Sequence, residues 1–190
     1  MNPFFQHPYV LNMQYIFLSG LLVACSVLFL LKRKNSPYRL SALPLLALTF
    51  HQVDEYLLSP LLLGDDYHFL NWAYRSGVDI APNAVVAVNL FGYLGALLVC
   101  CFKPATRLFV LIFLFVNSIT LANACFHIGL ATAQSDYSPG MISALFLFLP
   151  LYIKSITLAV ESMCSFREMF VISLYGFIAH YVLIWIINVY

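Results

Sequence analysis

Hydrophobic stretches of about twenty residues alternate with short polar or basic turns along the whole chain. An α-helix rises 1.5 Å per residue, so about 20 residues cross the ~30 Å hydrocarbon core of a membrane. The pattern predicts six helical spans, at about residues 10–31, 40–63, 81–102, 108–132, 141–160 and 169–190. We therefore expect an all-α fold, an integral membrane helical bundle with about six transmembrane helices that form a single domain over residues 1–190.

Two of the connections carry further signals. The longest, residues 64–80, contains Tyr67 and Trp72, and aromatic side chains are frequent at the membrane–water interface. We predict a loop there. Ser138 and Pro139 precede the fifth hydrophobic stretch. A serine followed by proline is typical of a helix start, so Ser138 is predicted to cap the next helix.

Composition supports a membrane environment. The 190 residues are 63% hydrophobic and 9% charged, whereas soluble domains contain about 25% charged residues. A water-soluble fold of this size is therefore excluded, and membrane lipid is the expected partner. No basic run is long enough to bind nucleic acid. The five cysteines include no CxxC pair and are odd in number, so we interpret them as small buried hydrophobic residues rather than disulfides.

The basic residues predict an orientation. If the chain crosses the membrane six times, the connections after the first, third and fifth spans lie on the same side. Eight of the nine Lys and Arg residues lie in or near these connections, and only Arg75 lies on the other side. Cytoplasmic loops are enriched in Lys and Arg, so both termini are predicted outside the cytoplasm, across the inner membrane if the protein is bacterial. The first nine residues lack Lys and Arg, so we expect the first span to be retained rather than cleaved as a signal peptide.

Three ionisable residues lie within the second hydrophobic stretch. His51, Asp54 and Glu55 are spaced i, i+3 and i+4, so a helix places them on one face. Charged groups at membrane depth are costly, so they usually face the protein interior and serve a function. The alternative is a polar contact that only joins two helices.

Other polar residues are predicted at similar depth. Asn123 and His127 lie in the fourth stretch and His180 in the sixth. At about 1.5 Å per residue, they fall between the membrane midplane and the outer face, as His51 does. We expect one shared cavity, with Tyr137 at its outer edge. The alternatives are hydrogen bonds to neighbouring helices for Asn123 and His127, and simple packing for His180.

Two chemistries fit these residues. In the first, a divalent ion (Zn, Fe or Mn) is bound by nitrogen and oxygen ligands. The predicted ligands are His51, Asp54, Glu55, His127 and His180. In the second, the site performs metal-free acid–base catalysis with a buried carboxylic acid. The predicted catalytic residues are Glu55, Asp54, His51 and Tyr137. The outer halves of the predicted spans contain no Lys or Arg, so a cation, a proton or a charged His must offset two adjacent carboxylates.

Three short motifs occur in order, at residues 51–55 (HQVDE), 123–127 (NACFH) and 137–140 (YSPG). In order and spacing they resemble the HxxEE, NxxxH and YxPG motifs of the HXXEE-domain family of multi-pass membrane proteins. Asp54 stands where the family name has Glu, so this carboxylate is one methylene shorter. The resemblance implies the fold and the motif positions, and it implies no activity. The architecture is also similar to that of the emopamil-binding sterol isomerases, as an analogy only.

We expect a membrane-embedded, metal-dependent enzyme that acts on a lipid-like or other hydrophobic substrate. One alternative is a transporter or ion-binding protein that uses the same carboxylates. The others are a metal-free acid–base isomerase and a structural subunit without chemistry. The sequence predicts neither the substrate nor the oligomeric state.

Overall fold

The computed structural model describes residues 8–34, 36–78, 82–104 and 106–189, and within these ranges the fold is all helical. The α-helices are α1 (Pro8–Arg33), α2 (Arg39–Val53), α3 (Ser59–Leu63), α4 (Phe69–Arg75), α5 (Pro82–Cys100), α6 (Arg107–Gln134), α7 (Met141–Ser143), α8 (Leu149–Glu161) and α9 (Phe166–Val189). Shorter segments are the π-helical η2 (Asp54–Leu58) and η4 (Ala144–Phe148) and the 3-10 helix η3 (Asp65–Tyr67). The predicted all-α class is confirmed.

Four helices of the described ranges are long and apolar enough to cross a membrane. They are Asn12–Arg33, Arg107–Gln134, Met141–Glu161 and Phe166–Trp185. A shorter apolar stretch, Ala87–Cys100, lies within α5. Large apolar side chains such as Phe29, Leu90 and Phe170 are exposed on these helices. Such a surface suits lipid better than water, and it supports a membrane protein.

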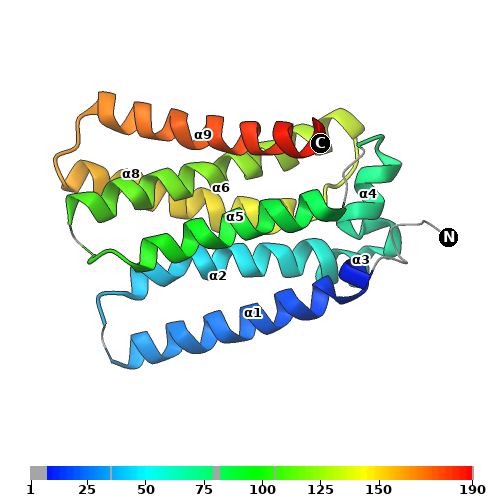
Figure 1. The fold of residues 1–190 in the computed structure, drawn as a ribbon, viewed down its shortest axis with the longest axis horizontal. Coiled ribbons are helices and arrows are strands. Elements are labelled where there is room, and N and C mark those ends of the chain that lie inside the picture. The colour runs from blue at the N-terminus through cyan, green and yellow to red at the C-terminus, as the bar shows by residue number, and fades with distance from the viewer. Residues whose placement is uncertain (1–7, 35, 79–81, 105, 190) are drawn as a thin grey trace.

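The long helices lie side by side with α6 near the middle of the bundle (Figure 1). Helix α6 packs against α8, α9 and α5, α5 packs against α2, and α2 packs against α1. Phe109, Phe113 and Leu114 of α6 are almost fully buried in the core. A Cβ added at Gly176 of α9 would lie 2.5 Å from the Cβ of Ser118. This glycine therefore allows α9 to lie directly on α6.

Two helical paths change register near a proline. In η2 the Ser59 N–H donates to the carbonyl of Asp54, five residues back, and Pro60 follows. In η4 the Leu149 N–H donates to the carbonyl of Ala144, and Pro150 follows. Proline has no N–H, and its ring clashes with the carbonyl four residues earlier in a regular helix. A π-helical turn relieves this conflict. The predicted span 40–63 is thus helical throughout but not one regular α-helix.

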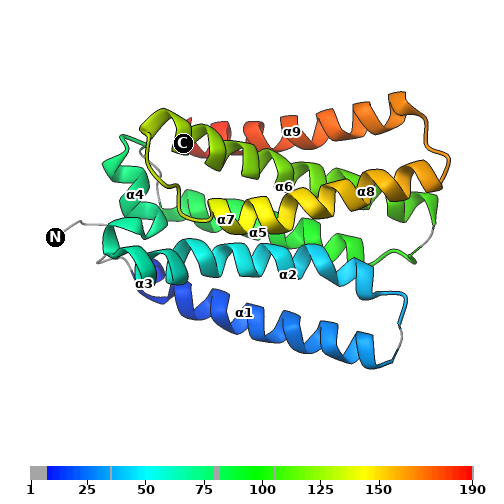
Figure 2. The same cartoon turned by 180° about the vertical axis from the view of Figure 1, so that it is seen from behind.

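The predicted loop at residues 64–80 contains helical structure instead. Helix α4 lies across one end of the bundle, beside η3 (Figure 2). Phe69, Trp72 and Ala73 are buried, and their i, i+3, i+4 spacing forms one apolar face. This face packs on the bundle, so the loop prediction was wrong for this segment.

Ionic contacts connect α4 to the segment between α6 and α7. The Arg75 guanidinium donates to Asp136 Oδ2 at 2.9 Å, and the Tyr67 hydroxyl donates to Asp136 Oδ1 at 2.9 Å. The Arg75 guanidinium also lies 5.1 Å from the centre of the Tyr67 ring. The single basic residue of this end therefore holds α4 in place.

Turns and termini divide between the two ends of the bundle. The α1–α2, α5–α6 and α8–α9 turns lie together at one end, and α4 lies at the other with the start of α1 and the end of α9 (Figures 1 and 2). Among the described residues, Lys and Arg lie in or beside those three turns, except for Arg75 and for Lys154, which lies within α8 in the half of the fifth span nearer the turns. The eight-to-one division expected from the sequence therefore corresponds to the two ends of one bundle.

Candidate metal site

Two imidazoles and one carboxylate meet inside the bundle. Glu55 Oε1 lies 3.4 Å from His51 Nε2 and 3.2 Å from His127 Nε2. These ligand atoms all lie within 4.8 Å of one another, and all three residues are buried. His51 and Glu55 are one helical turn apart, and α6 supplies His127. Among the described residues, this is the group of His, Cys, Asp and Glu side chains that could hold a metal ion.

Hydroxyl groups fix the other nitrogen of each imidazole. Ser143 Oγ lies 3.0 Å from His51 Nδ1 and donates its own proton to the Gly140 carbonyl at 2.9 Å. The serine oxygen is therefore free to accept from His51 Nδ1–H. Ser138 Oγ makes the corresponding 3.0 Å contact with His127 Nδ1. Histidines that bind metals usually donate their second ring N–H to such a partner.

The Nε2 atom of His51 has one further neighbour. The Asn123 side-chain amide donates to it at 3.0 Å, which requires a lone pair on Nε2. Together with the Ser143 contact, this assigns a neutral imidazole with its proton on Nδ1. A neutral imidazole with a free Nε2 lone pair is the form that binds metals.

Gly140 lets the chain pass directly beside the cluster. Its φ is +86°, a conformation that L side chains rarely adopt. A Cβ built there would lie 2.6 Å from Glu55 Cγ and 2.8 Å from His51 Cε1. Only glycine satisfies both conditions. The YSPG motif therefore forms one wall of the site.

Asp54 faces different partners from its neighbour Glu55. Its Oδ2 accepts from the Ser143 backbone N–H at 3.2 Å, and its Oδ1 accepts from the Ser59 hydroxyl at 3.2 Å. The π turn produces this pairing, because it brings Ser59 beneath Asp54 rather than beneath Glu55. Asp54 was predicted as a ligand, and its carboxylate instead joins η2 to the start of the fifth span.

His180 and Tyr137 also lie outside the cluster. His180 is 3% exposed, and its ring centre lies 6.5 Å from that of Phe126, which in turn lies 5.9 Å from His127. The Phe126 ring thus lies near both histidines, and among the described residues His180 does not belong to the ligand group. The Tyr137 hydroxyl lies 3.4 Å from Ser59 Oγ. Burial raises the pKa of this phenol.

A large cavity begins at the cluster. Its volume is about 820 Å³, and its lining includes His51, Glu55 and His180. Most of the other lining side chains are apolar and come from α2, α5, α6 and α9. Asn123 lines it as well, so the predicted shared cavity includes four of the expected residues, whereas His127 and Tyr137 are not part of its lining. Glu55 is the charged residue of the lining, which includes no Lys or Arg.

Sequence reasoning missed several groups that complete the site. Ser138 was predicted as a helix cap, but its hydroxyl contacts His127, and the helix begins after Gly140 without a side-chain cap. The Phe148 ring lies 4.7 Å from the His51 ring. Ser138 lies within the YSPG motif, and its position there was the available signal. Ser143 and Phe148 lie in an apolar stretch of the sequence with no motif, which gave no signal.

One buried histidine, His68, lies beside α4 and outside the cluster. His68 precedes α4, and its ring packs edge-on against Tyr56 at 5.2 Å between centres. Burial lowers the pKa of His68 to about 4. The imidazole is therefore neutral at pH 7 and belongs to the apolar packing beneath α4.

Comparison with known proteins agrees with the motifs. Residues 42–155 match the family described as "Protein of unknown function with HXXEE motif". No curated protein and no solved structure matches the chain. The matched range includes all three motifs that meet at the cluster. Because the match covers more than half of the 190 residues, the chain belongs to the HXXEE family.

Proposed function

We propose that this protein is a multi-pass membrane enzyme in which His51, Glu55 and His127 bind one divalent metal ion. The substrate is lipid-like or otherwise hydrophobic. Zn, Fe and Mn are the candidate ions, because a set of two imidazoles and one carboxylate suits each of them. Such an ion lowers the pKa of a bound water to about 7 or polarises a substrate carbonyl.

The convergence of three ligand atoms beside a cavity supports this proposal. Two Nε2 atoms and one carboxylate oxygen lie within 4.8 Å of one another. Catalytic zinc sites have three protein ligands and one open position, whereas structural sites have four protein ligands. His51 and Glu55 line the cavity, so the open position faces a space that a substrate can occupy. The Asn123 amide is the group that an incoming ion would displace from His51.

The proposed topology has six spans with both termini outside the cytoplasm. Four of these spans are the long apolar helices. The other two are α5 and the helical path that runs from α2 through η2 to α3. The basic turns at one end support this orientation. A cysteine introduced at Asp66 should react with an impermeant reagent on intact cells, in a background without the native cysteines. Reaction only after permeabilisation contradicts the orientation.

Two alternative functions, transport and metal-free acid–base catalysis, are each supported by one structural feature. The π-interrupted helices η2 and η4 resemble the broken helices that line transporter sites. The 3.2 Å contact between Glu55 and His127 also fits metal-free proton transfer. Ion flux in proteoliposomes without substrate turnover would favour transport. Turnover by metal-free protein would favour acid–base catalysis.

The direct test is the metal content of detergent-purified protein. Wild-type chain, purified without chelators and then offered Zn, Fe(II) or Mn(II), should hold about one ion, as expected for a three-ligand site. Glu55→Gln and His127→Gln should lose it. His180→Gln is the matched control, because it removes a buried imidazole from the same cavity but not from the cluster. Folded wild-type protein that takes up no ion, or equal loss in the control, contradicts the metal site.

A further inference from the structure

The cavity beside the proposed metal site is elongated. Along α5 its lining extends from Val85 to Leu98. Thirteen steps at 1.5 Å correspond to about 20 Å of length. With a volume of about 820 Å³, this space fits a long, narrow molecule. His51 and Glu55 of the cluster form part of its lining, and among the described residues α5 contributes no ligand.

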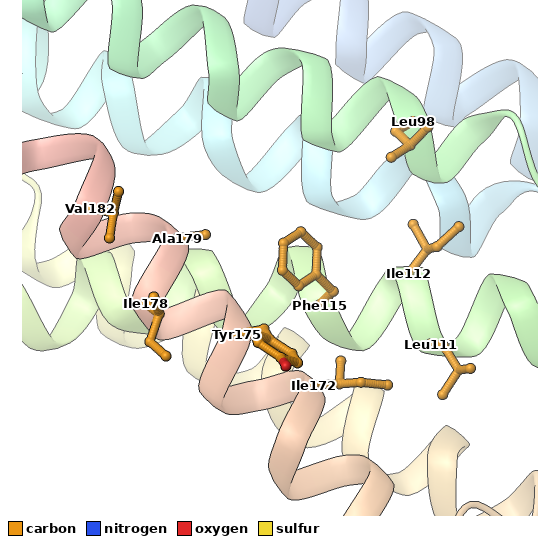
Figure 3. A pocket seen from close by; sticks show the side chains of 9 residues that line it. All are labelled: Leu98, Leu111, Ile112, Phe115, Ile172, Tyr175, Ile178, Ala179 and Val182. Carbon is orange, nitrogen blue, oxygen red and sulfur yellow. The ribbon is translucent and has the colours of Figure 1, made fainter. Parts of the chain in front are cut away.

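A second space continues this cavity toward the outside of the bundle. It has a volume of about 560 Å³ and is lined by α5, α6 and α9 (Figure 3). Leu98, Phe115, Ala179 and Val182 line both spaces. The Phe115 side chain extends into the gap between α5 and α9 (Figure 3). The cavity therefore opens sideways, between these two helices.

Packing of α9 explains why the opening lies on this side. A Cβ at Gly176 would lie 2.5 Å from Ser118 Cβ and 2.9 Å from the Phe115 carbonyl oxygen. The absence of a side chain at Gly176 thus holds α9 closely against α6. No such close approach joins α9 to α5 at the glycines of α5, because Gly95 faces Val116 of α6 and Gly92 faces Leu48 of α2.

The chemistry of the walls restricts the occupant. The side chains that line the outer groove are apolar except for the Tyr175 hydroxyl, and neither space is lined by Lys or Arg. In the site without a bound ion, an anionic head group would therefore meet Glu55 without a counter-charge. His180 Nε2 is buried, lines the cavity and has no hydrogen-bond partner among the described residues. A buried polar atom of this kind calls for a partner, and a ligand oxygen can supply it.

We propose that the cavity binds an uncharged single-chain lipid with an oxygen-bearing head group, which enters from the membrane between α5 and α9. The hydrocarbon chain lies in the apolar length of the cavity and the groove. The head group lies between His180 and the cluster, where an alcohol accepts from or donates to the imidazole and a carbonyl or ester oxygen accepts from it. This lipid would be the substrate of the enzyme proposed above, and that it reacts there rests on the proposed function. Binding of the chain requires no metal.

A photoreactive probe tests this binding directly. The probe is a long-chain alcohol with a diazirine in mid-chain, and the matched probe is the fatty acid of equal length. Wild-type protein in detergent, freed of metal with a chelator, is irradiated with each probe, and the modified residues are mapped by mass spectrometry. The alcohol should label cavity residues such as Val116 and Ile119, and it should do so more efficiently than the acid. Labelling confined to outward-facing residues, or stronger cavity labelling by the acid, overturns the proposal.

Variants at the opening test the route. Ala179→Trp places bulk where the cavity meets the groove, and cavity labelling should fall by about tenfold, which corresponds to 1.4 kcal/mol. Leu174→Trp is the control, because Leu174 is on the same helix, is 46% exposed and lines neither space. Phe115→Ala should change labelling in the opposite direction by widening the gap. Equal labelling of all three variants and wild type overturns lateral entry.

Variants at Glu55 and His180 separate this proposal from the metal site. Glu55→Gln should lose the metal but keep cavity labelling by the alcohol. His180→Leu should keep the metal and lose the preference for the alcohol over the acid, whereas His180→Gln should retain part of that preference. Loss of metal binding with intact labelling would therefore refute only the proposed function. Metal binding without cavity labelling would refute only the lipid site.

Discussion

The two ends of the bundle handle charge in opposite ways. At the end with the basic turns, Arg107 and Glu168 form an ion pair in which both side chains are at least 40% exposed. Toward the other end, Glu55 is 6% exposed and meets two imidazoles that are each 1% exposed. Water screens the first pair, so replacing either partner should change the stability little. The second group is buried, so each polar atom needs a placed partner.

This difference appears in the surroundings of each group. Around the buried cluster, two serines hold the imidazoles, Asn123 donates to one of them, and Gly140 gives the necessary space. The exposed pair has only a local arrangement, in which Glu168 accepts from the Ser165 backbone N–H and hydroxyl at the start of α9. Substitutions near the cluster should therefore have much larger effects than substitutions near the exposed pair.

The largest effect is expected for Gly140→Ala. The added Cβ would lie 2.6 Å from Glu55 Cγ, and the left-handed backbone adds strain of about 1–3 kcal/mol. We expect loss of the bound metal and a clear fall in the thermal unfolding temperature in detergent. Gly129→Ala is the control, because a Cβ there meets nothing within 4 Å and alanine favours a helix. A Gly140→Ala protein with wild-type metal content would refute the close approach at this wall.

An intermediate effect is expected when the serine partners are removed. Ser143→Ala and Ser138→Ala leave the ligands in place but release their Nδ1 atoms. Loss of such partners typically lowers metal affinity by about 10–100-fold, which competition with a chelator of known affinity can measure. Ser155→Ala is the matched control, because Ser155 is buried and its hydroxyl donates only to the Tyr152 carbonyl within its own helix. Unchanged affinity in both serine variants would mean that the imidazoles are oriented by packing alone.

The smallest effect is expected at the exposed end. Glu168→Gln removes the charge that faces Arg107 but keeps an oxygen that can accept from Ser165. Metal content should be unchanged, and any shift of the unfolding temperature should shrink as salt is added, because salt screens exposed charges. A salt-independent destabilisation similar to that of Gly140→Ala would remove the contrast between the two ends.

The sequence predicted the helices well wherever an apolar stretch alone defines them. The fourth span was expected at 108–132 and is α6, Arg107–Gln134, and the fifth was expected to begin at Met141, as it does. The prediction failed where single residues, rather than the length of an apolar stretch, determine the structure. Pro60 imposes a π turn within the second span, and Phe69 and Trp72 form a small buried face inside a predicted loop.

The candidate site shows the same limit. His51 and Glu55 were correctly placed together, because i and i+4 share a helix face, and the NxxxH motif pointed to His127. Asp54 was misplaced because the prediction assumed a regular helix, whereas the π turn pairs it with Ser59. The distance of His180 from the cluster depends on how α9 is rotated against α6. Gly176 sets that contact, and no pattern along one helix reveals the rotation of another.

The π turn at Asp54–Leu58 makes this helix unusually sensitive to where a residue is lost. The turn holds one residue more than an α-helical turn, because the Ser59 N–H bonds the carbonyl five residues back. Loss of Leu57 would make Ser59 the fourth residue after Asp54, so a regular α-helix would keep that bond and would keep the exposed Leu61 and Leu62 on the outer surface. Loss of a residue from the regular part of α2 would instead turn everything that follows by about 100°. A deletion within the π turn should therefore be tolerated far better than one a single turn earlier.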